Sequence, residues 1–396
     1  MINLQLNLYS IVNMKLQKHL NKYRQEKNCT LLCVGPMSKN CVDATIELAD
    51  QYKAPLMLIA SRRQIDSEQF GGGYVENWTT KEFSDYVRSK DINKNIILAR
   101  DHGGPWQNEI EKNKNMNLKA AMQSAKDSYR ADINAGFQML HIDPSIDIHF
   151  KPSADQILER VYELYDFCWS YAQQKNQDII FEIGTEEQSG SNNSKEELEY
   201  TLEKMRKFCA NNKLPFPSFI VIQAGTRVME TKNIGSFDSP IRVANELPAE
   251  IQIPQMIDIC DKYGILMKEH NTDYLSTDSL RWQPRLGIHA ANIAPEFGVA
   301  ETKAFIDILK KSGHIDLVDE FLKISYESMK WKKWMLKNTD ANDTDRAIIA
   351  GHYVFSSNEF IKLKAKALKK IDNLEVLLKN KVKESIFRYM SAFNLT

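Results

Sequence analysis

Short apolar runs alternate with longer amphipathic stretches along most of the chain. Eight such runs occur, each bounded by turn-forming or polar residues: 30–34, 55–60, 95–99, 138–142, 179–183, 219–223, 265–269 and 286–290. They lack the strict alternation of apolar and polar residues that is typical of a strand with one face in water. We therefore predict eight strands that are buried on both faces, as in a parallel sheet.

The stretches between these runs carry apolar residues at helical spacing. The stretch at 118–137 ends near a glycine stop, and the one at 153–174 begins with a Ser-x-x-Gln capping box. Further helices are predicted at 39–52, 79–90, 194–212, 253–264 and 298–313. Eight strand-then-helix units over about 300 residues favour an α/β fold of the (β/α)8 TIM-barrel type. A doubly wound sheet would alternate in the same way, but the first turn, VGPMSKN, lacks the glycine fingerprint of a dinucleotide site.

After residue 313 the pattern becomes helical throughout. Apolar residues recur at helical spacing at 315–338 and 358–390, and the segment between them is predicted as a loop or short helix. We therefore predict three parts: an N-terminal helical segment at 1–28, the barrel at 29–313 and a C-terminal helical extension, an appendage to the barrel, at 314–396.

Composition adds mainly exclusions. The 396 residues include 52 Lys and Arg against 52 Asp and Glu, a balance that argues against nucleic acid or an anionic membrane as a general partner. No apolar run reaches the length of about 18 residues that a membrane span needs, and residues 1–28 lack a signal-peptide core. The six cysteines form no C-x-x-C pair. We interpret them as core residues of a reduced, cytoplasmic protein.

Polar and ionisable residues stand at the ends of the predicted strands, which a barrel brings to one rim. They include Asp101, His102, His141, Asp143, Glu182, Glu186, Gln223, His270 and Asp273. Each alone has an ordinary structural explanation, such as a core histidine or a helix cap. So many buried ionisable groups at one rim would be costly without a use, so we predict a metal or acid–base site. Imidazole with carboxylate suits zinc first, and manganese, magnesium or nickel are alternatives.

The stretch ARDHGGPWQ at 99–107 raises a geometric question. Adjacent side chains leave a strand in opposite directions, so Asp101 and His102 reach one site only if the chain re-aims one of them. Gly103 and Gly104 would allow such a turn, and Pro105 would end strand pairing.

Five motifs lie at these strand ends: SRRQIDSEQFGGGY (61–74), IILARDHGGPW (96–106), AGFQMLHIDPS (135–145), FEIGTE (181–186) and KEHNTDY (268–274). Together they resemble motifs of the GatZ/KbaZ-like family, the Z-type subunits of class II D-tagatose-1,6-bisphosphate aldolases. The segments WKKW (331–334) and TDRAIIAGHY (344–353) look similar to that family as well, so the likeness covers roughly residues 25–365.

This family is similar in turn to class II fructose-bisphosphate aldolases, which are metal-dependent barrels. The resemblance implies that Asp101 handles protons and that His102 and His270 bind the metal, with Asp143 and Glu182 as further acidic positions. Strand six of those aldolases carries a third metal-binding histidine. Here Gln223 stands in its place, and an amide is a poorer zinc ligand.

One hypothesis is an enzyme acting on a ketose or ketose phosphate, such as a tagatose or fructose phosphate. The metal, held by His102, His270, Asp143, Glu182 or His141, would polarise the C2 carbonyl. The candidates for moving the C4 hydroxyl proton are Asp101, Glu186 and Asp273. If the products of retro-aldol cleavage are released, the enzyme is an aldolase. If the cleaved fragment adds back to the other face of the aldehyde, the enzyme is a 4-epimerase.

Several residues are candidates for binding the substrate or its phosphate: Ser61, Arg62, Arg63, Gln64, Gln223, Gly225, Thr226, Asn271, Thr272 and Arg346. Arg346 could reach the site from its own or a neighbouring subunit, or form a surface ion pair. His141 and His289 could each be a ligand or a core histidine.

The second hypothesis is a non-catalytic accessory subunit that stabilises a catalytic aldolase, and the third is a sugar-binding barrel without chemistry. The expected partners are a sugar or sugar phosphate and either a second copy of the chain or an aldolase subunit, with no nucleic acid and no membrane.

Overall fold

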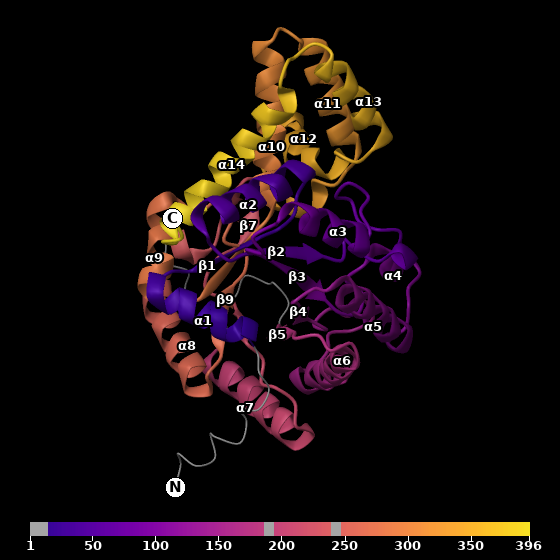
Figure 1. The fold of residues 1–396 in the computed structure, drawn as a ribbon. Coiled ribbons are helices and arrows are strands. Elements are labelled where there is room, and N and C mark those ends of the chain that lie inside the picture. The colour runs from indigo at the N-terminus through magenta and orange to yellow at the C-terminus, as the bar shows by residue number, and fades with distance from the viewer. Residues whose placement is uncertain (1–14, 186–193, 239–246) are drawn as a thin grey trace.

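The computed structural model describes residues 15–185, 194–238 and 247–396. Within them, eight parallel strands close into a barrel in the order β1-β10-β9-β6-β5-β4-β3-β2, which confirms the predicted (β/α)8 architecture (Figure 1). The strands are β1 (Leu31–Val34), β2 (Leu56–Ser61), β3 (Ile96–Gly103), β4 (Met139–Ile142), β5 (Ile180–Ile183), β6 (Phe219–Ile222), β9 (Leu266–Glu269) and β10 (Ala290–Ile293). A short antiparallel pair, β7 (Val228–Met229) and β8 (Lys232–Asn233), follows β6.

The predicted eighth strand at 286–290 was wrong in its position. Residues Thr277–Leu286 form helix α9, the chain turns at Gly287 with φ of 85°, and β10 begins only at Ala290. His289 therefore lies just before the amino end of β10, away from the strand ends where functional groups gather. Its Nδ1 accepts a hydrogen bond from the Met267 backbone N–H at 2.9 Å. These contacts are those of a core histidine.

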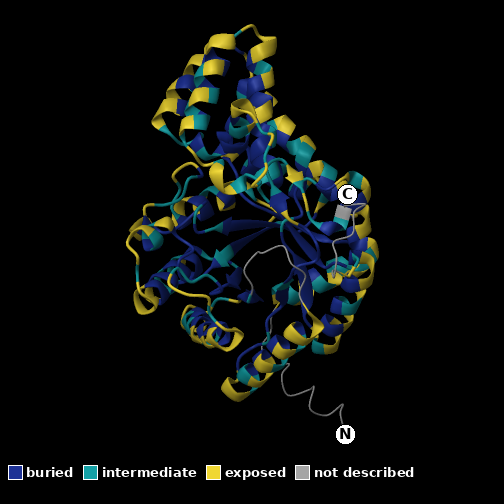
Figure 2. Cartoon of the chain, turned by 180° about the vertical axis from the view of Figure 1, so that it is seen from behind, coloured by how far each residue is buried: buried dark blue, intermediate teal, exposed yellow. Residues whose placement is uncertain are grey.

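Helices cover the outside of the barrel, so the strands and the inner faces of the helices are buried while the outer faces are exposed (Figure 2). They are α2 (Lys39–Tyr52), α3 (Thr80–Lys90), α5 (Leu118–Ala135), α6 (Ala154–Gln174), α7 (Lys195–Asn212), α8 (Ala249–Tyr263), α9 and α10 (Pro295–Lys311), preceded by α1 (Lys15–Lys27). The capping box predicted at Ser153 is present, because Ser153 and Gln156 cap each other's backbone N–H groups. Gly136 ends α5 in the left-handed conformation.

The C-terminal helical extension forms a lobe beside the barrel and then returns to it (Figure 1). Helices α11 (Ile315–Glu327), α12 (Asp343–Ala350) and α13 (Asn358–Leu368) pack around a separate small core with the end of α10. Helix α14 (Leu374–Ala392) then runs along the barrel beside α2 and α9, and its second half joins the barrel core. The predicted helical stretch at 358–390 is thus two helices, separated by a turn in which Asn373 has φ of 58°.

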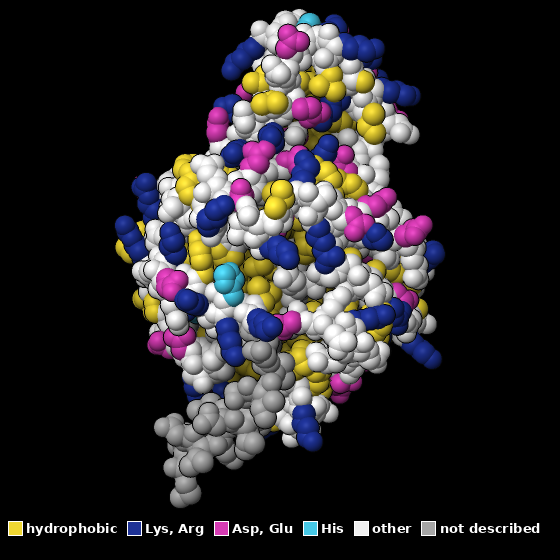
Figure 3. All heavy atoms as spheres, in the orientation of Figure 1, with side chains coloured by type: hydrophobic (Ala, Val, Ile, Leu, Met, Phe, Trp, Pro, Cys, Tyr) yellow, Lys and Arg dark blue, Asp and Glu magenta, His cyan; other side chains and the backbone are white. Residues whose placement is uncertain are grey.

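Charged side chains of both signs are interspersed over the barrel and the lobe on the face that Figure 3 shows. All six cysteines are buried and free of disulfides, in keeping with the interpretation that they are core residues. Among the residues that the structure describes, no helix combines the length and the apolar character that crossing a membrane would require.

Candidate functional site

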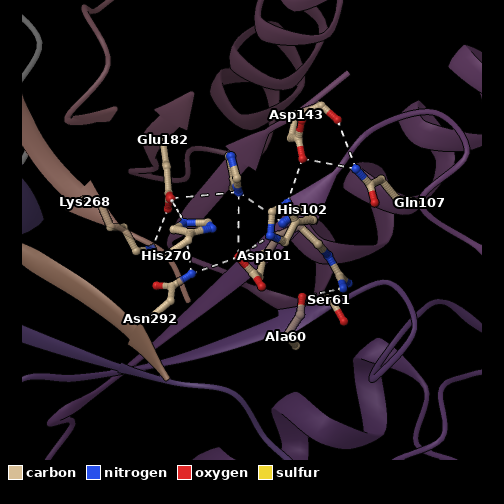
Figure 4. Close-up of polar contacts among 12 residues, drawn as sticks. Ala60, Ser61, Asp101, His102, Gln107, Asp143, Glu182, Lys268, His270 and Asn292 are labelled. Carbon is tan, nitrogen blue, oxygen red and sulfur yellow. Dashed lines mark hydrogen bonds and ion pairs between the residues drawn. The ribbon is translucent and has the colours of Figure 1, made fainter. Parts of the chain in front are cut away.

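Asp101 and His102 face the same centre because β3 is irregular at this point (Figure 4). The pairing of β3 with β4 shifts register between Arg100 and Gly103, and His102 has φ of 43°, in the left-handed region. The strand continues to Gly103. We predicted that Gly103 and Gly104 turn the chain at this point. The turn lies one residue earlier, at His102, which itself adopts the left-handed conformation.

Three histidines meet beside this irregularity. His102, His141 and His270 come from β3, β4 and the end of β9, and their ring centroids lie 5.0 to 5.4 Å apart. Three overlapping groups bring their ligand atoms within 4.8 Å of one another: Asp101, His102 and His270; His102, His141 and Asp143; and His141, Glu182 and His270. Each of these groups could hold a metal ion.

Two further observations fit a metal at this centre. His141 Nε2 is buried and has no hydrogen-bond partner in the described part of the chain. A cavity of about 10 Å³, close to the size that a single water needs, is lined by His102, His141, Gly184 and Gln223, among others. Gly184 leaves His141 this room, since a Cβ at position 184 would lie 2.5 Å from His141 Nε2.

Hydrogen bonds to carboxylates orient two of the rings. Asp143 Oδ2 lies 2.7 Å from His102 Nδ1, and Ser145 Oγ donates to Asp143 Oδ1 at 2.5 Å. Glu182 Oε1 lies 2.9 Å from His270 Nε2, and Lys268 Nζ donates to Glu182 Oε2 at 2.6 Å. Carboxylates that contact a histidine ring in this way commonly fix the orientation of metal ligands.

The sequence interpretation missed two members of this centre, Lys268 and Asn292. Lys268 stood out only as a lysine inside the apolar run at 265–269, and its side chain is completely buried against Glu182. Asn292 Nδ2 donates to Asp101 Oδ1 at 3.1 Å and lies 3.0 Å from His270 Nε2. Both residues are polar and lie within buried strands, and this unusual placement could have marked them as members of a site.

Burial and neighbouring charges together determine the protonation of these groups. Burial by itself would raise the pKa of Asp101, but the charge on His102 holds it well below its usual range. Burial would lower the pKa of His102, but the charge of Asp101 and the hydrogen bond with Asp143 raise it to about 9. Burial lowers the pKa of His270 to about 4 despite the contact with Glu182. His270 is therefore neutral at pH 7, the form in which imidazole binds metals.

A cavity of about 460 Å³ opens onto this centre, and Asp101, His102 and Asp143 line part of it. Ser61 and Gln64, both predicted to contact substrate, line it as well. Gln64 Oε1 accepts hydrogen bonds from the Ser61 N–H and hydroxyl, each at 2.9 Å. The helical extension completes the wall with Lys333, Trp334 and Tyr353.

Two predicted arginines do not line this cavity. Arg62 is buried in an ion network, with its Nε 2.9 Å from Asp66 Oδ2 and its Nη1 2.5 Å from Glu111 Oε1. Its neighbour Arg63 lines the cavity instead. Arg346 lies on α12, where its Nη1 pairs with Asp343 Oδ1 at 2.9 Å. The surface ion pair, one of the two alternatives for Arg346, is thus the contact observed.

The residues predicted after strands six and seven mainly hold two loops together. Thr226 Oγ1 donates to the His270 carbonyl at 2.7 Å, and the Thr272 N–H donates to the Asn292 carbonyl at 3.2 Å. Gly225 and Asn271 adopt left-handed backbone, with φ of 87° and 61°. Gln223 borders the small cavity beside the histidines. Glu186 falls outside the described residues, so its role stays a prediction.

Asp273, predicted as a proton carrier, lies in the loop after β9, and its side chain contacts the start of helix α10. Its Oδ1 accepts hydrogen bonds from the Ala294 and Glu296 N–H groups at 3.0 and 2.8 Å. Burial raises the pKa of Asp273 to about 8, so the side chain is mostly neutral at pH 7.

We therefore expect Asp273→Asn, which keeps an accepting oxygen, to change the free energy of unfolding at pH 7 by less than about 1 kcal/mol. Asp273→Ala leaves two N–H groups without an acceptor and should lower it by about 2–4 kcal/mol. Urea denaturation of both variants measures the difference. Equal damage from both substitutions would show that the negative charge is required.

Solved structures share this fold along most of their length. A probable tagatose 6-phosphate kinase from Sinorhizobium meliloti 1021 aligns with a TM-score of 0.72 at 16% identity, over 92% of this chain and 100% of that one. The fructose-bisphosphate aldolase of Campylobacter jejuni aligns with a TM-score of 0.55 at 12% identity, over 97% and 94%. The fructuronate-tagaturonate epimerase UxaE of Cohnella laeviribosi aligns with a TM-score of 0.53 at 10% identity, over 92% and 79%.

A family model covers most of the barrel. It is described as D-tagatose-1,6-bisphosphate aldolase subunit GatZ/KbaZ-like, and it matches residues 16–283. The match contains all five strand-end motifs together with the three clustered histidines. The protein therefore belongs to the GatZ/KbaZ-like family of D-tagatose-1,6-bisphosphate aldolase subunits.

Proposed function

We propose that the protein is a metal-dependent enzyme that acts on a ketose or ketose phosphate by retro-aldol and aldol chemistry. The observation that carries this proposal is the meeting of three imidazoles with buried carboxylates beside a cavity of about 460 Å³. Family membership supports the substrate class. So does the fold shared with proteins described as an aldolase and as a ketose-acid epimerase.

In this proposal His102, His141 and His270 hold the metal, with zinc as the first choice for imidazole donors and manganese, magnesium or nickel as alternatives. His141 supplies a third imidazole in a chain that has Gln223 on strand six. Asp143 and Glu182, predicted as ligands, serve to orient His102 and His270 through their ring nitrogens. When bound, the metal would polarise the carbonyl group of the substrate.

Asp101 is our choice for the group that moves the proton of the C4 hydroxyl. It lines the cavity beside His102, and Asn292 donates to its Oδ1 at 3.1 Å, which fixes the position of the carboxylate. Its carboxylate is ionised at pH 7, because the charge on His102 holds its pKa well below its usual range. If the aldehyde fragment leaves after C3–C4 cleavage, the protein is an aldolase. If the fragment turns and adds back, the protein is a 4-epimerase.

Incubation of the zinc-loaded full chain with tagatose and fructose phosphates tests this function. We expect either the C4 epimer or two three-carbon products, detected by NMR, and no product from chelator-treated protein. Absence of both kinds of product with every one of the metals named would contradict the proposal.

The alternative is an accessory subunit, because the family description itself names an aldolase subunit. In that case the chain would have no turnover alone but would form a stable complex with a catalytic aldolase. Removing this chain from the complex would then lower the activity of its partner. Turnover by the isolated chain therefore separates the two functions.

A further inference from the structure

Lys268 is a completely buried lysine beside the three histidines (Figure 4). It lies on β9, two residues before His270, so both side chains leave the chain on the same face and point into the barrel. Lys268 Nζ donates to Glu182 Oε2 at 2.6 Å, and Glu182 Oε1 lies 2.9 Å from His270 Nε2. The carboxylate therefore stands between an ammonium and an imidazole, with one oxygen toward each.

A cation at this place is unexpected. An ammonium repels a divalent cation, so Lys268 weakens the electrostatic attraction of the centre for a metal. Stability alone does not explain the ion pair, because a buried pair of charges is often no more stabilising than two apolar side chains of similar volume. Lys268 has no exposed surface, so a substrate in the cavity does not contact it. Its effect on the site has to pass through Glu182.

Glu182 has the position of a possible metal ligand. One of its oxygens lies within 4.8 Å of ligand atoms of both His141 and His270, and its Oε1 is 3.9 Å from His141 Nδ1. A carboxylate with no other cation nearby would turn toward a divalent metal at this point, because opposite charges attract strongly inside a protein. The bond to Lys268 engages the second oxygen and offsets the negative charge, and both effects oppose ligation.

Asp143, the carboxylate that orients a second histidine, is held in a different way. Ser145 Oγ donates to its Oδ1 at 2.5 Å, and Gln107 Nε2 donates to its Oδ2 at 3.1 Å. Both donors are neutral, which shows that a carboxylate of this centre can be oriented without a cation. The ammonium of Lys268 therefore does more than orient Glu182, since it also reduces the charge that Glu182 presents to the metal.

We propose that Lys268 is a positioning residue that binds Glu182 and thereby keeps this carboxylate from becoming a ligand of the metal. This inference rests on the metal centre of the proposed function. It assigns Glu182 to the His270 ring, so that a coordination position of the metal stays open for the oxygen atoms of a substrate. A catalytic metal needs such an open position, whereas a metal surrounded by protein ligands alone is typical of a structural site.

Cobalt binding to the full chain tests the inference, because the visible spectrum of cobalt depends on the number of its ligands. Lys268→Met removes the ammonium and releases Glu182. We expect this variant to bind cobalt about tenfold more tightly than the unchanged protein, since a cation is lost and a carboxylate is gained beside the metal. Its visible absorption should weaken, because cobalt with more ligands absorbs less strongly. Turnover of ketose phosphates should fall by about 10- to 100-fold.

The double variant Lys268→Met with Glu182→Gln separates this role from a structural one. It leaves no buried charge unpaired, so it keeps the inference testable even where the single variant fails to fold. An amide is a poorer ligand than a carboxylate. We therefore expect the cobalt spectrum to return to that of the unchanged protein. Lys262→Met is the matched control, because it removes an exposed lysine that lies 3.0 Å from Glu199, and it should change neither affinity nor spectrum.

Three results would overturn the inference: weaker cobalt binding by the Lys268→Met protein, as a merely structural ion pair predicts, an unchanged spectrum in that variant, or an altered spectrum in the double variant. The proposed function fails in a different way. If the unchanged protein binds no cobalt, the metal centre is refuted and the inference with it. If cobalt binds with the expected changes but no ketose phosphate is turned over, the enzyme is refuted and the role of Lys268 is retained.

Discussion

Replacement of His102 by alanine is expected to lower the affinity of the protein for zinc by about 100-fold or more. His102 takes part in two of the three groups that could hold a metal, and Asp143 orients its ring through a 2.7 Å hydrogen bond. Elemental analysis after dialysis should then show a fall from about one metal ion per chain to almost none. Turnover of ketose phosphates should be lost at the same time.

The matched control is His19→Ala, which removes an exposed histidine on α1. His102 sits at the left-handed position of β3, so alanine could disturb the strand as well as the metal. The His102→Asn variant addresses this point, because asparagine tolerates left-handed backbone well and lacks the imidazole. Full metal content in both His102 variants, each shown to be folded by circular dichroism, would contradict the proposed centre.

The adjacent arginines should give opposite results when each is changed to methionine. Arg62→Met is expected to lower the free energy of unfolding by about 3–5 kcal/mol, because Asp66 and Glu111 would lose a fully buried partner. Arg63→Met should lower it by less than about 1 kcal/mol, because its ion pair with Glu109 is partly exposed to solvent. Guanidinium unfolding curves for the two proteins measure this difference.

Ligand binding should reverse the order. The Arg63→Met protein should lose affinity for fructose 6-phosphate, and the folded Arg62→Met protein should keep it, because only Arg63 lines the cavity. A stable Arg62→Met protein with weakened phosphate binding would instead support the interpretation from sequence, in which Arg62 contacts phosphate. We therefore expect Arg62 to stabilise the fold and Arg63 to contact the ligand, although the two residues are adjacent in the sequence.

The extension gives the cavity a wall that a barrel alone would lack. Lys333, Trp334 and Tyr353 come from the part of the chain beyond α10, yet they line the same cavity as Asp101 and His102. Helix α14 then packs along the barrel and joins its core. The division of the chain at residue 314 stays a prediction, and these contacts make the extension a contributor to the candidate site.

The periodic pattern of the chain was sufficient to predict the barrel and to place most of its strands. Burial imposes a local signature on each strand and each helix face, so runs such as 30–34 and 179–183 could be recognised without tertiary information. The strand-end position of Asp101, His102, His141 and His270 followed from the same pattern, because parallel strands bring their carboxyl ends to one rim. The exception was β10, where the amphipathic α9 escaped notice.

Only the tertiary structure decided which side chains meet. Arg62 and Arg63 are equivalent in the sequence, and the fold of the β2–α3 loop buries one and turns the other toward the cavity. Lys268 pairs with Glu182, which lies 86 positions earlier in the chain. Lys333 lines the same cavity as Arg63, which lies 270 positions earlier. Hydrophobic periodicity indicates which face of one helix or strand is buried, whereas these contacts depend on how distant elements pack. For this reason the sequence determined which residues lie at the rim of the barrel, and the tertiary structure decided which of their side chains contact one another.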